Sequence, residues 1–367
     1  MAESGYSHTF PAIRGVQAGQ VFYVAMCPLK IVPKIFIFNE HEVPPELRAQ
    51  RSLNKARIPE IASYLLENPD NYILSALTSS IDATDVDFQP YEKTGHQGNM
   101  GVLSIPMDAR ILINDGQHRR AAIEQALKEN PVIGHDNVPV LFFIDAGLIR
   151  SQQMFADLNK YAVRPGQSLG TLYDHRDPTS ELARHIAMHC TAFQGLVEME
   201  KSNISNRSVK LFTLSGIKHA SRALLKKTNS AKVSEEEREL ALEFWETVAA
   251  QLPDWKRAKE RTVAASELRE NYIHAYGIAL HALAIAGAEL IKAHPEDWKS
   301  RIQKISQIDW SRSNSQLWEG RAMNHGRISK ARVNVLLTSN LIKQHLELPL
   351  KPEEWELESE RKNERSN

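Results

Sequence analysis

A short apolar run in this chain ends at a polar turn and passes directly into a helix-forming run, and this junction constrains the fold more than any other segment. Residues 111–113 are Ile-Leu-Ile, residues 114–116 are Asn-Asp-Gly, and residues 117–127 favour a helix. The apolar side chains of that helix share one stripe that must face a sheet, namely Ala122, Ile123, Ala126 and Leu127. Such a junction directs unpaired N–H groups and the positive end of the helix dipole to one sheet edge. It therefore predicts an α/β layer with an anion site, suited above all to phosphate, at residues 116–119.

The helical register separates the polar side chains that follow the turn. His118 and Arg119 precede the apolar stripe by four residues, so they point towards the strand ends, and on this interpretation they have no local partner. Arg120 lies four residues before Glu124, which predicts an exposed helical pair worth roughly a few tenths of a kcal/mol. The alternative is that Asp115 merely caps the helix and His118 is satisfied within the protein.

The five residues Asp115-Gly116-Gln117-His118-Arg119 resemble the DGQHR signature of a bacterial family that includes DndB, which is associated with DNA phosphorothioate modification clusters. Further blocks are similar to other segments of that family and occur in the same order. They are residues 51–65, residues 153–160, Trp310-Ser-Arg312, Trp318-Glu-Gly320 and Gly326-Arg327-Ile328. The resemblance therefore covers about residues 15–350, most of the chain.

The distribution of strand and helix patterns predicts an α+β protein. Up to about residue 145, β-rich runs alternate with helical patterns, and the clearest of these runs are Val21–Val24, Lys34–Phe38 and Val138–Ile144. After about residue 150 the patterns are helical. We therefore expect a mixed α/β domain at 1–150, a helical and partly basic domain at 151–350, and a solvated, charged tail at 351–367. The resemblance implies a ParB/sulfiredoxin-like fold for the first domain.

The resemblance also implies what the motif binds. In relatives of that fold the same strand-to-helix junction holds nucleotide phosphates. The implied phosphate or nucleotide pocket comprises Gly116, Gln117, His118, Arg119, Asp157 and Asn159. Its implied ligand is a nucleoside triphosphate, with Mg²⁺ held by Asp157.

If the protein is an enzyme, the candidate catalytic residues are Asp115, Gln117, His118 and Arg119. His118 is then the acid/base group, and Arg119 stabilises phosphate charge. No separate metal site is expected, because His185 and His189 have metal-ligand spacing but no further ligand cluster nearby.

Charge is balanced over the whole chain but not along it. The 45 basic and 45 acidic residues give a net charge of zero, so any nucleic-acid site must arise from local segregation of charge. Residues 201–233 contain eight Lys or Arg and no acidic residue, and residues 312–343 are also basic, with a single acid. The spacing of Lys218, Arg222 and Lys226 predicts a basic ridge on a helix over 214–227. The residues expected to contact DNA phosphates are Arg207, Lys210, Lys218, Arg222, Lys226, Arg327 and Lys330. The alternative is a solvated face that balances the acidic run at 235–239.

Other features of the sequence favour a cytoplasmic protein. Cys27 and Cys190 lack the number and spacing of a disulfide framework, so free thiols are expected. The N-terminus has no secretory pattern. The apolar run 272–291 contains two histidines and a glutamate, which favours a buried helix over a membrane span.

The sequence is compatible with two functions. The first is a DNA-binding transcriptional regulator, a repressor of a phosphorothioate modification gene cluster, whose partner is double-stranded promoter DNA. The second is a nucleotide-hydrolysing, DNA-nicking component of a phosphorothioation-linked phage-defence system. The sequence has no clustered carboxylates for nuclease chemistry, which favours regulation. A second copy of the chain is a further candidate partner.

Overall fold

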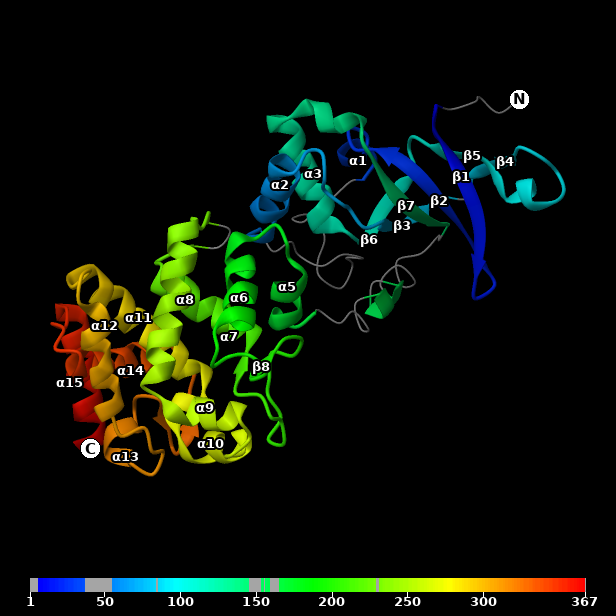
Figure 1. Cartoon of the computed structure of the whole chain (residues 1–367). Coiled ribbons are helices and arrows are strands. Elements are labelled where there is room, and N and C mark those ends of the chain that lie inside the picture. The colour runs from blue at the N-terminus through cyan, green and yellow to red at the C-terminus, as the bar shows by residue number, and fades with distance from the viewer. Residues whose placement is uncertain are drawn as a thin grey trace. The chain divides into compact units, whose positions relative to one another are not determined.

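The structure is a computed structural model, and it describes residues 6–36, 55–83, 85–144, 153–154, 156–158, 165–228 and 231–366. The chain forms two compact units, residues 1–163 and residues 164–367 (Figure 1). The first unit contains the large sheet and the second is mainly helical, as expected for an α+β protein.

The first unit is built on a mixed seven-stranded sheet with the order β4-β5-β1-β2-β7-β3-β6. Only β3 and β7 pair in parallel, and the other pairs are antiparallel. The strands are β1 (Ser7–Gln17), β2 (Gln20–Pro28), β3 (Leu77–Asp82), β4 (Asp87–Pro90), β5 (Met100–Pro106), β6 (Arg110–Asp115) and β7 (Asn137–Ile144).

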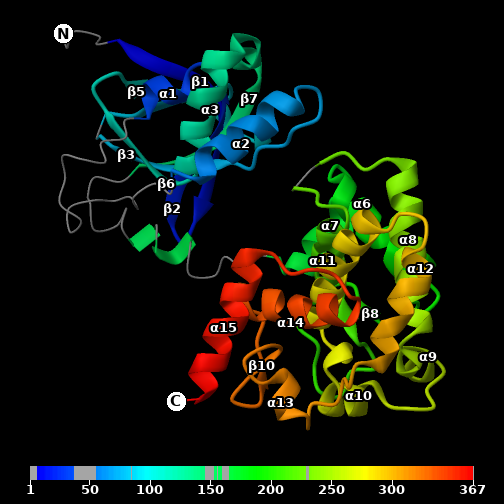
Figure 2. The same ribbon diagram turned by 90° about the vertical axis from the view of Figure 1, so that its left-hand side faces the viewer.

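Helices pack on the sheet of the first unit and close its core. They are α1 (Val32–Ile35), α2 (Arg57–Glu67), α3 (Gln117–Glu129) and the 3-10 helix η3 (Pro131–His135), whereas the 3-10 helix η2 (His96–Asn99) precedes β5 and contributes no residue to the core. The helices α2 and α3 lie side by side (Figure 1, Figure 2). Ala62 and Leu65 of α2 are buried in the same core as the apolar stripe of α3 and the inward side chains of the strands.

The junction that opened the sequence analysis folds as predicted. β6 ends at Asp115 and α3 begins at Gln117, and the stripe residues Ala122, Ile123 and Ala126 are buried. The expected strand Lys34–Phe38 is wrong where the structure describes it, because residues 32–35 form the helical turn α1. Pro33 in the first turn of α1 favours that turn, and β-forming composition alone did not reveal it.

The second unit consists mainly of helices. They are α5 (Gln167–Tyr173), α6 (Pro178–His189), α7 (Leu214–Leu224), α8 (Glu235–Ala250), α9 (Pro253–Lys259), α10 (Ala265–Asn271), η4 (Ile273–Ala275), α11 (Gly277–Ala293), α12 (Trp298–Arg301), η5 (Ile302–Gln307), α13 (Ser315–Trp318), α14 (Arg332–His345) and α15 (Pro352–Ser366). Two small sheets join β8 (Val197–Glu198) to β9 (Phe212–Thr213) and β10 (Met323–Asn324) to β11 (Arg327–Ile328).

Helix α11 is the central element of the second unit and packs against α7 and α14. Most of its side chains are buried, which explains why its sequence is apolar on nearly all faces. Gly287 allows a close approach, because a Cβ there would lie 2.2 Å from the ring of Phe244 on α8. The apolar run 272–291 thus forms the core of a helical unit, and none of the helices described is long and apolar enough to cross a membrane.

The end of the chain is a helix and not the solvated tail that we expected. Helix α15 follows α14 and packs against it (Figure 2). Glu358 is buried and its carboxylate binds Arg321 at 2.7 Å, while Glu354 binds Lys343 at 2.5 Å. The charged composition that suggested a tail therefore includes buried partners for two cations of the helical unit.

Candidate functional site

The turn at the motif depends on a glycine. Gly116 is the residue before α3 and has φ 107°, a left-handed conformation that glycine adopts readily. A Cβ at this position would lie 2.4 Å from Cδ2 of Leu77, a buried residue of β3. No side chain caps the start of α3, and the backbone N–H groups of its first turn are the groups on which the predicted anion site depends.

Arg119 is bound within the protein, so the expectation that it lacks a local partner is wrong. Its Nη1 donates to the carbonyl oxygens of Ser75 and Ala76, each at 2.7 Å. Its Nη2 binds Oδ2 of Asp115 at 2.5 Å. Both terminal nitrogens of the guanidinium therefore hold the segment before β3 against the turn, and the arginine is not arranged as a phosphate ligand.

Gln117 is also hydrogen-bonded within the protein. Its Nε2 donates to the carbonyl oxygens of Ile113 at 3.0 Å and Asn114 at 3.3 Å, and its side chain is buried. Behind it, Ser80 Oγ donates to Oδ1 of the fully buried Asn114 at 3.0 Å. These hydrogen bonds join the end of β6 to the neighbouring strand β3. Sequence reasoning missed Ser80, because a serine within a strand gives no sign of a distant partner.

The two remaining polar residues of the first turns of α3 are His118 and Arg120. His118 is half-buried in the first turn of α3. The predicted pair of Arg120 with Glu124 is confirmed, with 2.5 Å between Nη1 and Oε2, and Arg120 also donates to the carbonyl oxygen of Pro33 at 2.9 Å. The second pair fixes α3 to α1 and could not be seen from helical spacing.

The second segment expected at the motif is described in part. Asp157 is exposed and accepts a hydrogen bond from Nε2 of Gln153 at 2.8 Å, and Asn159 lies outside the described residues. Met154 Sδ lies 4.0 Å from Ser80 Oγ, which places residues 153–154 beside β3. Arg119 and Gln117 are bound internally and Asn159 is not described, so the structure describes only part of the nucleotide pocket that the sequence predicts. Among the residues that the structure describes, no group of three His, Cys, Asp or Glu side chains could hold a metal ion.

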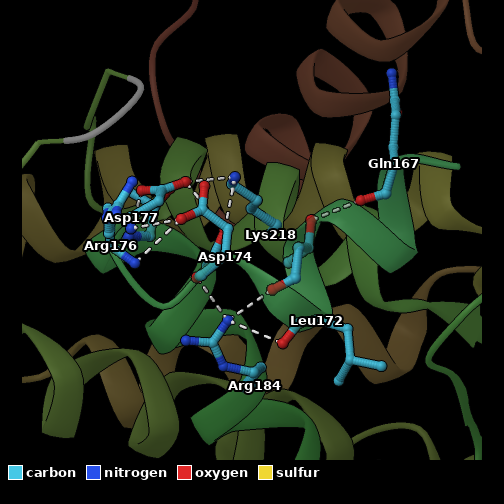
Figure 3. Close-up of polar contacts among 10 residues, drawn as sticks. Gln167, Leu172, Asp174, Arg176, Asp177, Arg184 and Lys218 are labelled. Carbon is cyan, nitrogen blue, oxygen red and sulfur yellow. Dashed lines mark hydrogen bonds and ion pairs between the residues drawn. The ribbon is translucent and has the colours of Figure 1, made fainter. Parts of the chain in front are cut away.

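In the helical unit, Lys218 is bound to Asp177 and does not stand on an open ridge (Figure 3). Its Nζ lies 2.5 Å from Oδ2 of Asp177 and 2.9 Å from Oγ of Ser180. Asp177 caps α6 by accepting from the N–H of Thr179 at 2.9 Å. Burial raises the pKa of Asp177, but the hydrogen bonds from Lys218 and Thr179 outweigh burial and lower the pKa to about 2.

The same junction is tied to α5 by an arginine. Arg184 of α6 donates to the carbonyl oxygens of Thr171 at 2.7 Å and Asp174 at 2.8 Å (Figure 3). Asp174 in turn accepts from the backbone N–H groups of Arg176 and Asp177. Lys218 is thus one member of a polar network that joins α5, α6 and α7, and a structural role explains its position.

Two more of the predicted DNA contacts have partners inside the unit. Lys226 pairs with Glu289 at 3.2 Å, and it lies beyond the end of α7 with a positive φ. Nζ of Lys210 donates to the carbonyl oxygen of Gly195 at 2.8 Å. The helix expected over 214–227 ends at Leu224, so the predicted ridge does not continue to Lys226.

Of the remaining predicted DNA contacts, three lie at the surface, whereas Arg222 is half-buried and its Nε is buried without a hydrogen-bond partner among the described residues. Arg207, Arg327 and Lys330 are exposed. A cavity of about 690 Å³ is lined by residues of the segments 202–204 and 328–330 and by the N-terminal ends of α7 and α11, and Lys330 is one of its lining residues. None of the described residues that line this cavity is acidic. The two basic segments of the sequence therefore meet at a single surface opening.

A buried arginine shapes the loop beside this cavity. Arg269 donates from Nη2 to the carbonyl oxygens of Ser205, Asn206 and Ser208 at 2.9–3.1 Å, and from Nη1 to that of Lys210. These four bonds hold the loop that carries Arg207. Sequence reasoning missed Arg269, because nothing in its neighbourhood along the chain indicates that it gathers a distant loop.

Two histidines on facing helices also line the cavity. Burial lowers the pKa of His219 on α7, and the charges of Arg222 and Lys218 lower it further. Burial lowers the pKa of His281 on α11, and His219 and Arg222 add to that effect. Sequence reasoning did not link these histidines, since they are far apart in the chain and meet only because α7 packs on α11.

The chain is thus a two-unit α+β protein with a strand-to-helix turn in one unit and, in the other, a cavity with no acidic residue among the described residues that line it. It matches the model of the DndB family, described as DNA-sulfur modification-associated, over residues 10–349. It therefore belongs to that family, and its role lies in DNA sulfur modification systems. The chain has no significant match among curated proteins or solved structures.

Proposed function

We propose that this protein is a DNA-binding regulator, a repressor of the genes of a DNA sulfur modification system, and that its helical unit contacts the DNA backbone. The observation that carries the proposal is the meeting of the two basic segments at one opening with no acidic lining residue. Exposed Arg and Lys side chains without carboxylate partners bind phosphates and release counterions from DNA.

The proposal concerns a smaller set of cations than the sequence suggested. Arg207, Arg327 and Lys330 are exposed, while Lys218, Lys226 and Lys210 are engaged within the unit. Ser202 and Asn203 line the same opening and supply the small polar side chains that contact phosphate oxygens. Lys330 lines this opening, and the exposed Arg207 and Arg327 lie within three residues of lining residues in the chain. A duplex across the opening can therefore meet cations from two chain segments, which fixes its orientation better than one helix would.

The test is fluorescence anisotropy with a duplex carrying the promoter of the modification genes, over a series of salt concentrations. The variant Arg207→Gln/Lys330→Gln should bind several-fold more weakly, and the slope of log affinity against log salt should fall by about 2. The matched control is Lys256→Gln, which removes a charge from an exposed side chain that lies on α9 and pairs with Glu260.

Two results would refute the proposal. One is an equal loss of affinity in the control and the double variant, which would mean that only net charge matters. The other is equal binding of promoter and unrelated duplex at every salt concentration, which would exclude a specific repressor. Phosphate release from ATP, CTP or GTP that is abolished by Arg119→Ala would instead establish the enzymatic alternative.

A further inference from the structure

The cavity of the helical unit opens at the surface and has the size and lining of a ligand pocket. Its volume of about 690 Å³ lies within the range of small-molecule sites. One part of its wall is apolar and includes Phe212, Ile278 and Val335. Another part is polar and includes Ser202, Asn203 and Lys330. A ligand with an apolar body and a polar head matches such a wall.

The charges around the polar part favour an anionic head group. Lys330 lines the cavity, and Arg222 acts electrostatically on both His219 and His281. Nε of Arg222 is buried without a hydrogen-bond partner among the described residues. None of the described residues that line the cavity is acidic. Lys330 therefore has no carboxylate partner in the lining, and an anion from solution can take that place.

The backbone adds to this preference. Tyr276, Gly277 and Ile278 at the start of α11 line the cavity, as do Thr213 and Gly216 at the start of α7. The side chain of Tyr276 does not cap α11. Thr213, by contrast, caps α7 by accepting from the N–H of Gly216 at 3.1 Å. The uncapped positive end of α11 therefore reaches the same cavity wall as Lys330.

We propose that this cavity binds a small organic phosphate of nucleotide size, with the phosphate near Lys330, His281 and the start of α11 and the organic part against the apolar wall. The ligand is thus a diffusible effector, and its pocket is separate from the DGQHR turn. Ligand binding by this cavity goes beyond the proposed DNA binding, because it is measured without DNA and is tested independently of DNA affinity.

Gly277 provides a variant that blocks the cavity and leaves the fold intact. A Cβ on Gly277 meets no atom within 4 Å, and its φ is not in the left-handed region, so Gly277→Leu adds a side chain at the cavity wall without backbone strain. Gly170 of α5 is the matched control, since a Cβ there also meets nothing within 4 Å and it is not among the lining residues. Both variants should unfold within a few degrees of the parent chain.

The experiment is isothermal titration of the full chain with inorganic phosphate, AMP, CMP, GMP and UMP, in the absence of DNA. At least one mononucleotide should bind at micromolar to millimolar concentration, and more tightly than inorganic phosphate. Gly277→Leu should weaken that binding at least tenfold and Lys330→Gln about fivefold, while Gly170→Leu should leave it unchanged.

Three outcomes would overturn the inference. They are no binding of any mononucleotide, binding that survives Gly277→Leu, and binding abolished by Gly116→Ala but not by Gly277→Leu. The last would place the ligand at the DGQHR turn. If only a short DNA duplex binds, and Gly277→Leu weakens it, the cavity is part of the DNA surface and not an effector pocket.

Discussion

The ion pair of Lys218 with Asp177 tests directly whether this lysine holds the helical unit together or serves DNA. The two side chains are 17% and 8% exposed, and the Nζ to Oδ2 distance is 2.5 Å. The pKa of Asp177 falls from 3.8 to about 2 in the folded protein. At about 1.36 kcal/mol per pKa unit, this difference corresponds to about 2.5 kcal/mol of stability at neutral pH.

The perturbation is Lys218→Met, which removes the charge and keeps most of the side-chain volume. Asp177 then remains buried without its cation, so we expect the free energy of unfolding of the helical unit to fall by about 2 kcal/mol at pH 7. Because the folded-state pKa lies below the unfolded value, this stabilisation is present above about pH 5 and is lost as the pH falls through 3.8 towards 2. The loss on substitution should therefore shrink to about 1 kcal/mol at pH 3.

The assay is urea unfolding followed by tryptophan fluorescence at pH 7 and pH 3. All six tryptophans lie between residues 245 and 355, so the signal reports on the helical unit. A double-mutant cycle with Asp177→Asn isolates the pair and should give a coupling of about 1.5–2 kcal/mol. Lys256→Met on an exposed surface is the control, with an expected change within about 0.5 kcal/mol.

Either of two results would refute this reasoning. The first is a coupling energy below about 0.5 kcal/mol, which would make the contact energetically irrelevant. The second is the same loss at pH 3 as at pH 7, which would show that Asp177 is not the partner that matters. The folded Lys218→Met variant should also bind DNA with the affinity of the parent chain. A large loss of affinity would mean that Lys218 contacts DNA.

Three further predictions follow from other contacts. Gly116→Ala should destabilise the first unit by about 1–3 kcal/mol, because the added methyl meets Leu77 and φ is positive; amide hydrogen exchange in that unit measures it, and unchanged protection would contradict it. Glu358→Ala should lower the free energy of unfolding by about 3 kcal/mol, because it removes the carboxylate that binds the buried guanidinium of Arg321. A lower urea midpoint measures this loss, and an unchanged midpoint would mean that the contact does not anchor α15. Because folding lowers the pKa values of His219 and His281, the unfolded chain binds protons at higher pH than the folded chain, so the free energy of unfolding should fall from pH 7.5 to pH 5.5. His281→Gln should reduce this pH dependence, and an unchanged pH dependence would show that His281 does not contribute to it.

The sequence predicted the strand-to-helix junction because its signals are local. An apolar strand, a turn with glycine and a periodic apolar stripe lie within residues 111–127, and each acts through its neighbours in the chain. The Arg120–Glu124 pair was predictable for the same reason. The family resemblance was also a matter of ordered local motifs, and the family match over residues 10–349 confirms it.

Partners that lie far apart in the chain could not be predicted in this way. Two of the partners of Arg119, Ser75 and Ala76, are more than forty residues away, and Asp177 is about as far from Lys218. The pair of Arg119 with Asp115 has local i, i+4 spacing and was missed although helical spacing could have indicated it. Residues of α15 read as solvated charges because their partners, such as Arg321, lie on earlier elements.

What the sequence by itself determined is therefore the class of the fold, the motif turn, the family and the places where charge is segregated. Only the tertiary structure decided which charges are available to a ligand. A cation that already donates to a carbonyl or carboxylate oxygen has fewer donors left for a ligand, and tertiary packing sets which of these contacts form. Packing of α7 on α11 left Lys330 and two histidines around an acid-free cavity, and it enclosed Lys218 against the cap of α6.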